Sequence, residues 1–137
     1  MNSEKSYIIE EEQEEIESLF FDSYAFFEIL EGNKNYIYYR DNYKIITSKL
    51  NIFEIYFGVL RNDNESDANK ILEKYYPFAV DFDEKVIADA AKLKMRLNKR
   101  DVSVVDCIGY SLALRLGVKF LTGDRVFEGM ENVEFVV

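Results

Sequence analysis

The chain alternates between short apolar runs and longer stretches in which apolar residues recur every three or four positions. Short apolar runs between polar or turn residues indicate buried β-strands. They predict strands at residues 17–21, 44–47, 78–82, 118–121 and 133–137. The periodic stretches indicate amphipathic helices. They predict helices at residues 23–30, 36–42, 48–60, 62–75, 83–98 and 104–116.

Strands that alternate with helices are typical of an α/β fold. We therefore expect a three-layer sandwich, in which helices flank a mostly parallel central sheet. Gly32 and Gly117 are expected to end helices, and Ser23 is expected to cap the helix that follows it. We expect one domain over residues 16–137, preceded by an acidic, polar extension over residues 1–15.

Composition narrows the class of protein. Apolar residues make up 48% of the chain, and its single cysteine, Cys107, cannot form an internal disulfide. No apolar run approaches the roughly 20 residues of a membrane span, and the first residues lack the apolar core of a signal peptide. We therefore expect a soluble, cytoplasmic protein. The net charge of −9 argues against binding nucleic acid through bulk positive charge.

The chain contains no histidine. Its absence excludes Ser-His-Asp and Cys-His catalysis, and it also excludes zinc and iron sites that depend on imidazole ligands. Catalysis would have to rest on carboxylates, hydroxyls, Lys or Arg, or a metal ion with oxygen ligands.

Four carboxylates stand beside or within strongly apolar segments, and we call them the acidic quartet: Asp22, Glu54, Asp106 and Asp124. A buried carboxylate is unfavourable unless it is paired, hydrogen-bonded or bound to a metal. Asp22 and Asp124 lie just after two predicted strands, at the edge where α/β sheets bind ligands. The pattern therefore predicts one shared acidic pocket that binds a hard divalent cation, which suits the hydrolysis of phosphodiester bonds.

Each member of the quartet also has a simpler explanation. Asp22 could be the N-cap of the helix that follows it, and Asp106 could cap a helix that starts near Cys107. Asp124 follows Thr122-Gly123 and could be a turn residue. Glu54 is harder to explain in this way, because no cation stands four residues before or after it.

Four segments resemble the motifs of the PIN domain, in particular its VapC-type toxin branch and the archaeal relatives of that branch. The resemblance covers roughly residues 17 to 137 and is carried by four segments in the right order. They are Phe21-Asp22-Ser23-Tyr24-Ala25, the helix segment 47–56 with Glu54, Val105-Asp106-Cys107-Ile108-Gly109, and Leu121-Thr122-Gly123-Asp124 followed by Phe127. Each motif alone is weak, whereas the four together are fairly specific.

The resemblance implies a parallel sheet flanked by helices and a ribonuclease that depends on Mg²⁺ or Mn²⁺. It implies that the acidic quartet is both catalytic and metal-binding, and that Ser23 or Thr122 positions water or a ligand. It also implies a homodimer that a small antitoxin protein neutralises. The chain departs from the family in its acidic extension and in its overall acidity.

Contact with RNA phosphates would need local positive charge. The candidate RNA-binding residues lie near the quartet in sequence or just before the last long helix: Arg61, Lys92, Lys94, Arg96, Lys99, Arg100 and Arg125. The alternative is a solvated helix face whose cations pair with the helix dipole. The clustered Tyr36, Tyr38, Tyr39 and Tyr43 could stack on bases, but we favour a role in the core or at a dimer surface.

Our leading hypothesis is a metal-dependent endoribonuclease that acts as the toxin of a type II toxin–antitoxin pair. One alternative is a PIN-like module that binds RNA or protein without cleaving it. Another is an RNA-processing nuclease outside any toxin system. A phospho-acceptor receiver domain is less favoured, because it needs a second acid beside Asp22 at the first strand.

Overall fold

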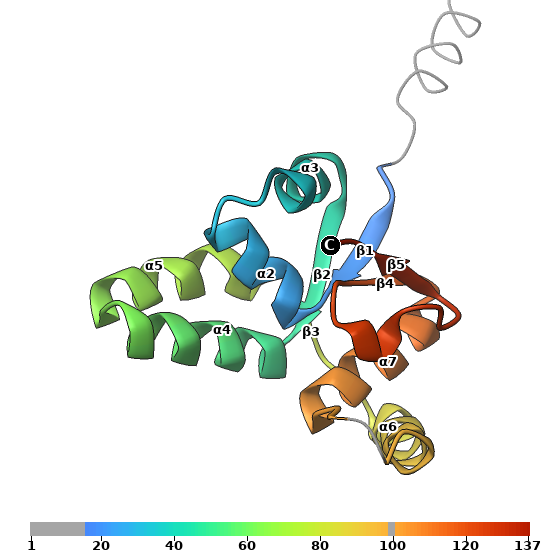
Figure 1. Ribbon diagram of the computed structural model, residues 1–137. Coiled ribbons are helices and arrows are strands. Elements are labelled where there is room, and N and C mark those ends of the chain that lie inside the picture. Colours follow the sequence, from blue (N-terminus) through green and yellow to red (C-terminus); the bar gives the residue numbers. More distant parts are fainter. Residues whose placement is uncertain (1–15, 99–100) are drawn as a thin grey trace, which may run out of the picture.

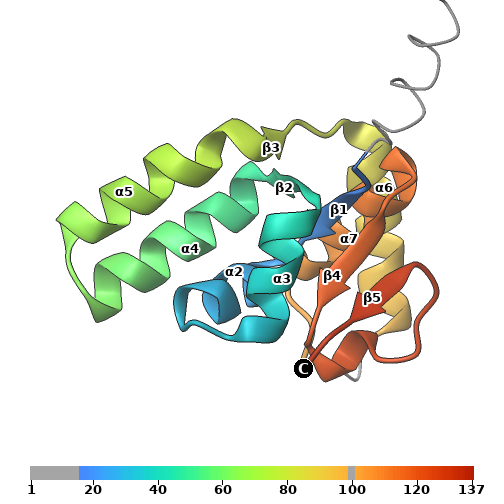
Figure 2. The same cartoon turned by 90° about the horizontal axis from the view of Figure 1, so that it is seen from above.

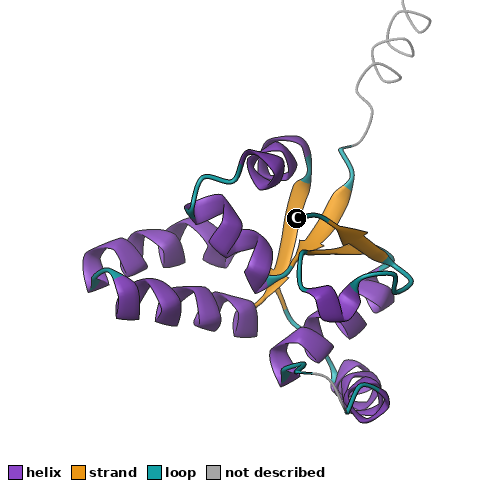
Figure 3. Ribbon diagram, in the orientation of Figure 1, coloured by secondary structure: helices purple, strands orange, loops and turns teal. Residues whose placement is uncertain are grey.

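The structure is a computed structural model that describes residues 16–98 and 101–137. A five-stranded sheet with the strand order β3-β2-β1-β4-β5 forms its middle layer, and all four strand pairs are parallel. Helices lie on both sides of this sheet (Figure 1, Figure 3). The expected α/β fold with a mostly parallel central sheet is confirmed.

The strands are short, and β1 lies at the centre of the sheet. Their bounds are β1 Ser18–Phe21, β2 Lys44–Ser48, β3 Ala79–Val80, β4 Lys119–Thr122 and β5 Val133–Phe135. The expected strand at 78–82 is too long, since only Ala79 and Val80 pair with β2. The turn of 3₁₀ helix η1, Tyr76–Phe78, comes directly before it and contains Pro77, whose ring lacks the N–H group that a strand needs.

Within residues 16–98 and 101–137, six α-helices accompany the strands. Their bounds are α2 Ser23–Leu30, α3 Lys34–Asn42, α4 Lys49–Asn62, α5 Glu65–Tyr75, α6 Glu84–Arg96 and α7 Val104–Leu116. The predicted bounds of α2 and α7 match the structure. Helix α5 begins three residues later than expected because Asn64 caps it through Asp67 N–H. The proposal that Ser23 caps α2 is wrong: Asp22 is the cap, and Ser23 is the first helical residue.

Alternate residues of β1 point to opposite faces of the sheet and belong to two cores. Leu19 and Phe21 pack in the core that α2 to α5 cover, whereas Phe20 packs in the core beneath α6 and α7. Figure 2 shows the long α4–α5 pair on one side of the strands and α6 on the other. The sheet therefore separates two helical layers, each with its own hydrophobic core.

The tyrosine cluster around α3 belongs largely to the fold. Tyr36 is fully buried, and its hydroxyl donates a hydrogen bond to the carbonyl oxygen of Val136. The Tyr39 hydroxyl donates to Glu134 Oε2 at 2.7 Å. The predicted core role is therefore confirmed for Tyr36, which ties α3 to the C-terminal strand.

No helix in the described ranges is long and apolar enough to cross a membrane. The expected acidic extension, residues 1–15, lies outside the described residues.

We predict that Phe127→Ala lowers the free energy of unfolding by about 3–5 kcal/mol, because it leaves a cavity in the core. Phe127 is fully buried, and its ring lies 5.0 Å from that of Phe120 and 5.6 Å from that of Tyr110. Urea unfolding monitored by circular dichroism measures the change.

Phe53→Ala is the matched control, because Phe53 is 68% exposed on α4. The same substitution should change the free energy of unfolding there by less than about 0.5 kcal/mol. Equal effects of the two variants would contradict the assignment of Phe127 to the core.

Candidate active site

The carboxyl ends of the three central strands bring polar side chains to one edge of the sheet. The pairing of Phe21 with Leu121 places Asp22, the residue after β1, level with Thr122 at the end of β4. The β1–β2 register places Ser48, the last residue of β2, at the same level. Ligands of open α/β sheets bind at this edge.

Asp22 is 2% exposed, and hydrogen bonds hold both of its carboxylate oxygens. Oδ1 accepts the backbone N–H of Ser23 at 2.8 Å, which makes Asp22 the N-cap of α2. Oδ2 accepts the hydroxyl of Thr122 at 2.7 Å. The simpler explanation of Asp22 as a helix cap is therefore correct, yet it does not account for a contact with a residue 100 positions away.

Thr122 connects Asp22 to Asp124. While its hydroxyl donates to Asp22, its Oγ1 accepts the backbone N–H of Asp124 at 3.1 Å. Asp124 Oδ1 in turn accepts the N–H of Val126 at 3.1 Å, so Asp124 caps the short 3₁₀ helix η2, Arg125–Phe127. This local capping role agrees with the interpretation of Asp124 as a turn residue, and the Thr122 hydroxyl links the backbone of Asp124 to the carboxylate of Asp22.

Glu54 is held by a series of hydrogen bonds that the sequence analysis missed. Ser48 Oγ donates to Asn51 Oδ1 at 2.6 Å, and Asn51 Nδ2 donates to Ser23 Oγ at 2.9 Å. The Ser23 hydroxyl then donates to Glu54 Oε1 at 2.6 Å. Ser48 and Asn51 are fully buried, so water does not compete for these bonds. The only sequence signal was a pair of polar residues inside a strongly apolar segment.

Asp106 lies at the third position of α7 and forms a capping box with Ser103. The Ser103 hydroxyl accepts the N–H of Asp106 at 3.0 Å, and Asp106 Oδ2 accepts the N–H of Ser103 at 3.1 Å. The expectation that Asp106 itself caps a helix near Cys107 is wrong, because the helix starts at Val104. The capping box fixes one oxygen of Asp106 and leaves Oδ1 without a hydrogen bond from the described residues.

Burial and neighbouring negative charge raise the pKa values of three members of the quartet, Asp22, Glu54 and Asp106. Burial, followed by the charge of Asp106, raises the pKa of Asp22 from 3.8 to about 8, and Glu54 adds to this rise. Hydrogen bonds from Thr122 and Ser23 oppose it. Burial raises the pKa of Glu54, with a further contribution from Asp106.

The negative charge of Asp124 also acts on the carboxyl group of Asp106. Burial raises the pKa of Asp106 most, the Ser103 hydrogen bonds lower it, and Asp124 raises it further. Such shifts between like charges require that the groups lie near one another. The four members of the quartet therefore lie along the carboxyl edge of the sheet within reach of one another's charge, whereas their convergence on a single metal site stays a prediction.

The geometry limits how a cation could bind. Within the described ranges, no three acidic side chains surround one point closely enough to hold an ion between them. Mg²⁺ does not need such a cage, because it is commonly bound by one or two carboxylates together with waters and substrate phosphates. The all-oxygen donors and their mutual repulsion fit a divalent cation of this kind.

The basic candidates are spread over several elements. The Arg61 guanidinium lies 5.3 Å from the centre of the Phe57 ring, and Arg125 pairs with Glu128 at 3.1 Å. Lys94 Nζ donates to the carbonyl oxygen of Val102 at 2.8 Å. Lys92 and Arg96 lie on α6, while Lys99 and Arg100 are outside the described residues.

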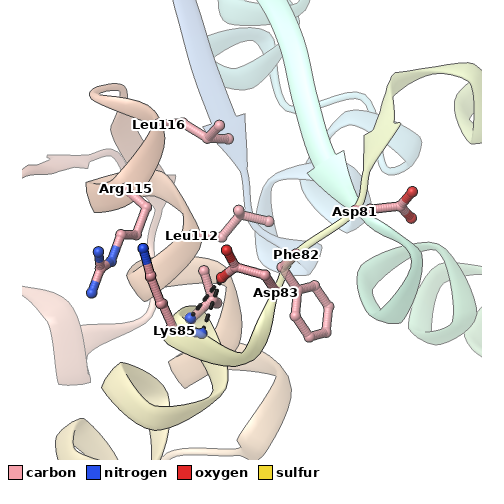
Figure 4. A pocket seen from close by; sticks show the side chains of 8 residues that line it. Asp81, Phe82, Asp83, Lys85, Leu112, Arg115 and Leu116 are labelled. Atoms are coloured by element: carbon pink, nitrogen blue, oxygen red, sulfur yellow. Dashed lines mark hydrogen bonds between the residues drawn. The ribbon is translucent and has the colours of Figure 1, made fainter.

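A cavity of about 500 Å³ lies away from the quartet (Figure 4). It lies between the start of α6 and the end of α7, with Leu112, Arg115 and Leu116 on one wall. Asp83 belongs to this cavity, but its Oδ1 accepts the N–H groups of Lys85 and Val86 and thereby caps α6. No member of the quartet lines this cavity, so it is separate from the edge of the sheet that carries the quartet, which we call the acidic rim.

Comparison with known proteins identifies the family. The model of the PIN domain matches residues 19–133. The chain belongs to the PIN domain family. No curated protein sequence matches it significantly. The four acids lie within the matched segment, at the carboxyl edge of the PIN domain's sheet.

Solved structures share the fold of this PIN domain. A toxin–antitoxin complex from Klebsiella pneumoniae aligns with a TM-score of 0.69 at 15% identity, covering 85% of this chain and 96% of the other. DNA-bound VapBC from Salmonella typhimurium gives a TM-score of 0.67 at 15% identity, covering 88% and 97%. FitAcB from Neisseria gonorrhoeae aligns with a TM-score of 0.67 at 19% identity, covering 86% of this chain and 96% of the other. At these identities the likeness establishes the fold.

We predict that the stability of the metal-free PIN domain falls as the pH rises from about 4 to 8. A carboxyl whose pKa is raised on folding contributes stability below its unfolded pKa, and this contribution is lost as the pH rises through the folded pKa. For Asp22 these limits are 3.8 and about 8. Asp22→Asn should therefore flatten the dependence and raise the free energy of unfolding at pH 8 by on the order of 2 kcal/mol.

Urea unfolding in EDTA at several pH values tests this prediction. Asp41→Asn is the matched control, because Asp41 is exposed on α3 and pairs only with the neighbouring Arg40. It should leave the pH dependence unchanged. A wild-type protein that becomes more stable between pH 4 and 8 would contradict the raised pKa of Asp22.

Proposed function

We propose that this protein is a metal-dependent endoribonuclease that hydrolyses RNA phosphodiester bonds and serves as the toxin of a type II toxin–antitoxin pair. The observation that carries the proposal is the convergence of the acidic quartet at the carboxyl edge, with the pKa of Asp22 raised to about 8. Strongly perturbed carboxyls that share one edge are typical of catalytic sites.

We propose Asp22 and Asp106 as the main ligands of Mg²⁺ or Mn²⁺, with Glu54 and Asp124 completing the acidic site. When bound, the ion supplies a Lewis acid that stabilises negative charge on the phosphate oxygens. The protein contributes the placement of its carboxylates. Asp22 is held at both oxygens, whereas Asp106 and Asp124 each use one oxygen for a local cap.

Glu54 is suited to take a proton from an attacking water. Burial and the charge of Asp106 raise its pKa, which brings its basicity closer to that useful near neutral pH. The Ser23 hydroxyl donates to Oε1, and Oε2 accepts no hydrogen bond from the described residues. We therefore assign Ser23 and Thr122 to the positioning of carboxylates, since their hydroxyls donate to Glu54 and Asp22 respectively.

The toxin assignment and the partners rest on similarity. The structural neighbours are described as a toxin–antitoxin complex and as VapBC bound to DNA. By this analogy we propose a small antitoxin partner and a homodimer. Basic residues near the rim, with Lys92 and Arg96 foremost, would offset the repulsion between the quartet and RNA.

We predict that Asp106→Asn lowers metal-dependent RNA cleavage by at least about 100-fold, because it removes a carboxylate from the centre of the quartet. The protein should remain folded, since the amide oxygen of asparagine can still accept the Ser103 N–H. Gel assays with several RNAs in Mg²⁺, Mn²⁺ or EDTA measure cleavage. Expression in cells should arrest growth with the wild type and not with Asp106→Asn.

Asp81→Asn is the control, because Asp81 is exposed and pairs with Lys49 outside the quartet. It should cleave like the wild type. Metal-dependent cleavage without growth arrest would favour an RNA-processing nuclease. RNA binding without cleavage in any metal would favour a binding module and would contradict our proposal.

We predict that Asn51→Leu lowers Mn²⁺ affinity or kcat by about 10–100-fold, although Asn51 lies behind the site. Outer partners that orient metal ligands have effects of this size. Leucine fills the same volume but cannot donate to Ser23, so Glu54 loses its fixed orientation. Calorimetric Mn²⁺ titration and steady-state kinetics separate the two effects.

Asn69→Leu provides the matched control on the exposed surface of α5, where Asn69 accepts a hydrogen bond from Tyr56 at 2.9 Å. It should change neither Mn²⁺ binding nor kcat. If Asn51→Leu binds Mn²⁺ and cleaves RNA like the wild type, the hydrogen bonds through Asn51 do not position Glu54.

A further inference from the structure

A second cavity, of about 190 Å³, lies between α6 and α7 and contains no member of the quartet. Asp89, Lys92, Leu93 and Arg96 line it from α6. Tyr110, Ser111 and Leu114 line it from α7. Its lining combines positive charge, a buried hydroxyl and apolar walls.

The cations of this cavity outnumber its one carboxylate, Asp89, whose pKa is lowered mainly by Arg115 and to a smaller extent by the charge of Lys92. Lys92 and Arg96 are four residues apart, so they lie on one face of α6. Within residues 16–98 and 101–137, neither forms an ion pair. Asp89, the acidic residue in the lining, is bound at 2.7 Å by Nε of Arg115. The cavity therefore has an excess of positive charge within a protein whose net charge is −9.

Ser111 provides an independent sign of a ligand. It is 2% exposed, yet its hydroxyl forms no hydrogen bond within the part of the chain that the structure describes. Buried hydroxyls almost always have a partner. The neighbouring Tyr110 follows this rule, since its hydroxyl donates to the carbonyl oxygen of Glu131 at 2.6 Å. Ser111 thus offers an unused donor at the wall of a positively charged cavity.

The position of the cavity links it to the acidic rim. Ser111 follows Asp106 by five residues on α7, which corresponds to about 7.5 Å along the helix axis and about 140° around it, so a strand that passes from the rim to the cavity crosses α7. The apolar side chains of Leu93 and Leu114 lower the local dielectric, and a hydrogen bond to a charged ligand is stronger in such surroundings.

We propose that Lys92, Arg96 and Ser111 bind a phosphate group of the RNA strand, beside the phosphodiester bond that lies at the acidic rim. The identity of the strand rests on the proposed function, whereas the preference for phosphate rests on the cavity itself. The two cations attract the phosphate, and the Ser111 hydroxyl donates to one of its oxygens. The site holds the strand in place and does not read its bases.

Binding of a fluorescent single-stranded RNA in EDTA, where metal-assisted cleavage does not occur, tests the proposal by anisotropy at several salt concentrations. Arg96→Ala should weaken binding and lower the slope of log K against log salt by about 0.7, the value for one phosphate contact on a single strand. Ser111→Ala should weaken binding at least about fivefold with an unchanged slope, because it removes a neutral donor. Lys70→Ala, on the exposed face of α5, should bind like the wild type.

Thermal stability separates a binding role for Ser111 from a purely structural one. Ser111→Ala should be at least as stable as the wild type without ligand, since it removes an unsatisfied buried hydroxyl. Inorganic phosphate should raise the melting temperature of the wild type more than that of Ser111→Ala.

Equal RNA affinity in the wild type, Arg96→Ala and Ser111→Ala would overturn the RNA assignment. If phosphate still stabilised only the wild type, the cavity would bind a free anion instead. If phosphate had no selective effect either, there would be no site. RNA binding that depends on both residues, in a protein that cleaves nothing in Mg²⁺, would keep this site and reject the nuclease proposal.

Discussion

The carboxylate of Asp22, buried at the end of the central strand, is the constraint on which the site depends. It follows β1, which has parallel neighbours on both sides and helices above and below. A charge in this position is unfavourable without partners. The Ser23 N–H and the Thr122 hydroxyl supply them, and these two bonds join the start of α2 to the end of β4.

Three members of the quartet also start helices. Asp22 caps α2, Asp106 lies in the first turn of α7, and Asp124 caps the short helix η2. Carboxylates are favoured at helix N-termini, because the free N–H groups there carry partial positive charge. This local stabilisation opposes the mutual repulsion of the acids and helps the protein to fold without a cation at the rim. Glu54 has no such support and instead depends on Ser23, Asn51 and Ser48.

The charge of the protein is divided in space. The rim at the carboxyl edge carries the quartet, whereas the free cations of α6 lie on the other wall of α7. An acidic protein of this kind can meet a polyanion only where local charge is reversed. The arrangement of α6 against α7 provides such a place on the far side of α7 from the acids, which would allow a protein with a net charge of −9 to bind the RNA substrate that we propose.

Several helix bounds could be predicted from the sequence because they depend on residues close together in the chain. The bounds of α2 and α7 followed from their apolar periodicity and from the glycines near their ends, Gly32 and Gly117, which adopt positive φ angles of 83° and 71°. The length of β3 was overestimated because an edge strand extends only as far as its pairing with β2. The apolar surroundings of the four acids, together with the resemblance to the PIN domain, led to the prediction that they act as a group.

The sequence by itself therefore determined the α/β fold class, most of the elements and the acids at the ends of strands. Only the tertiary structure decided which oxygen of each carboxylate accepts a hydrogen bond and which polar residues donate it. Asn51 resembles a surface residue of α4 until α4 packs against α2 and brings it to Ser23. Ser111 is an ordinary helical serine until α6 covers it. Such roles depend on contacts between residues far apart in the chain, and local sequence patterns carry no record of them.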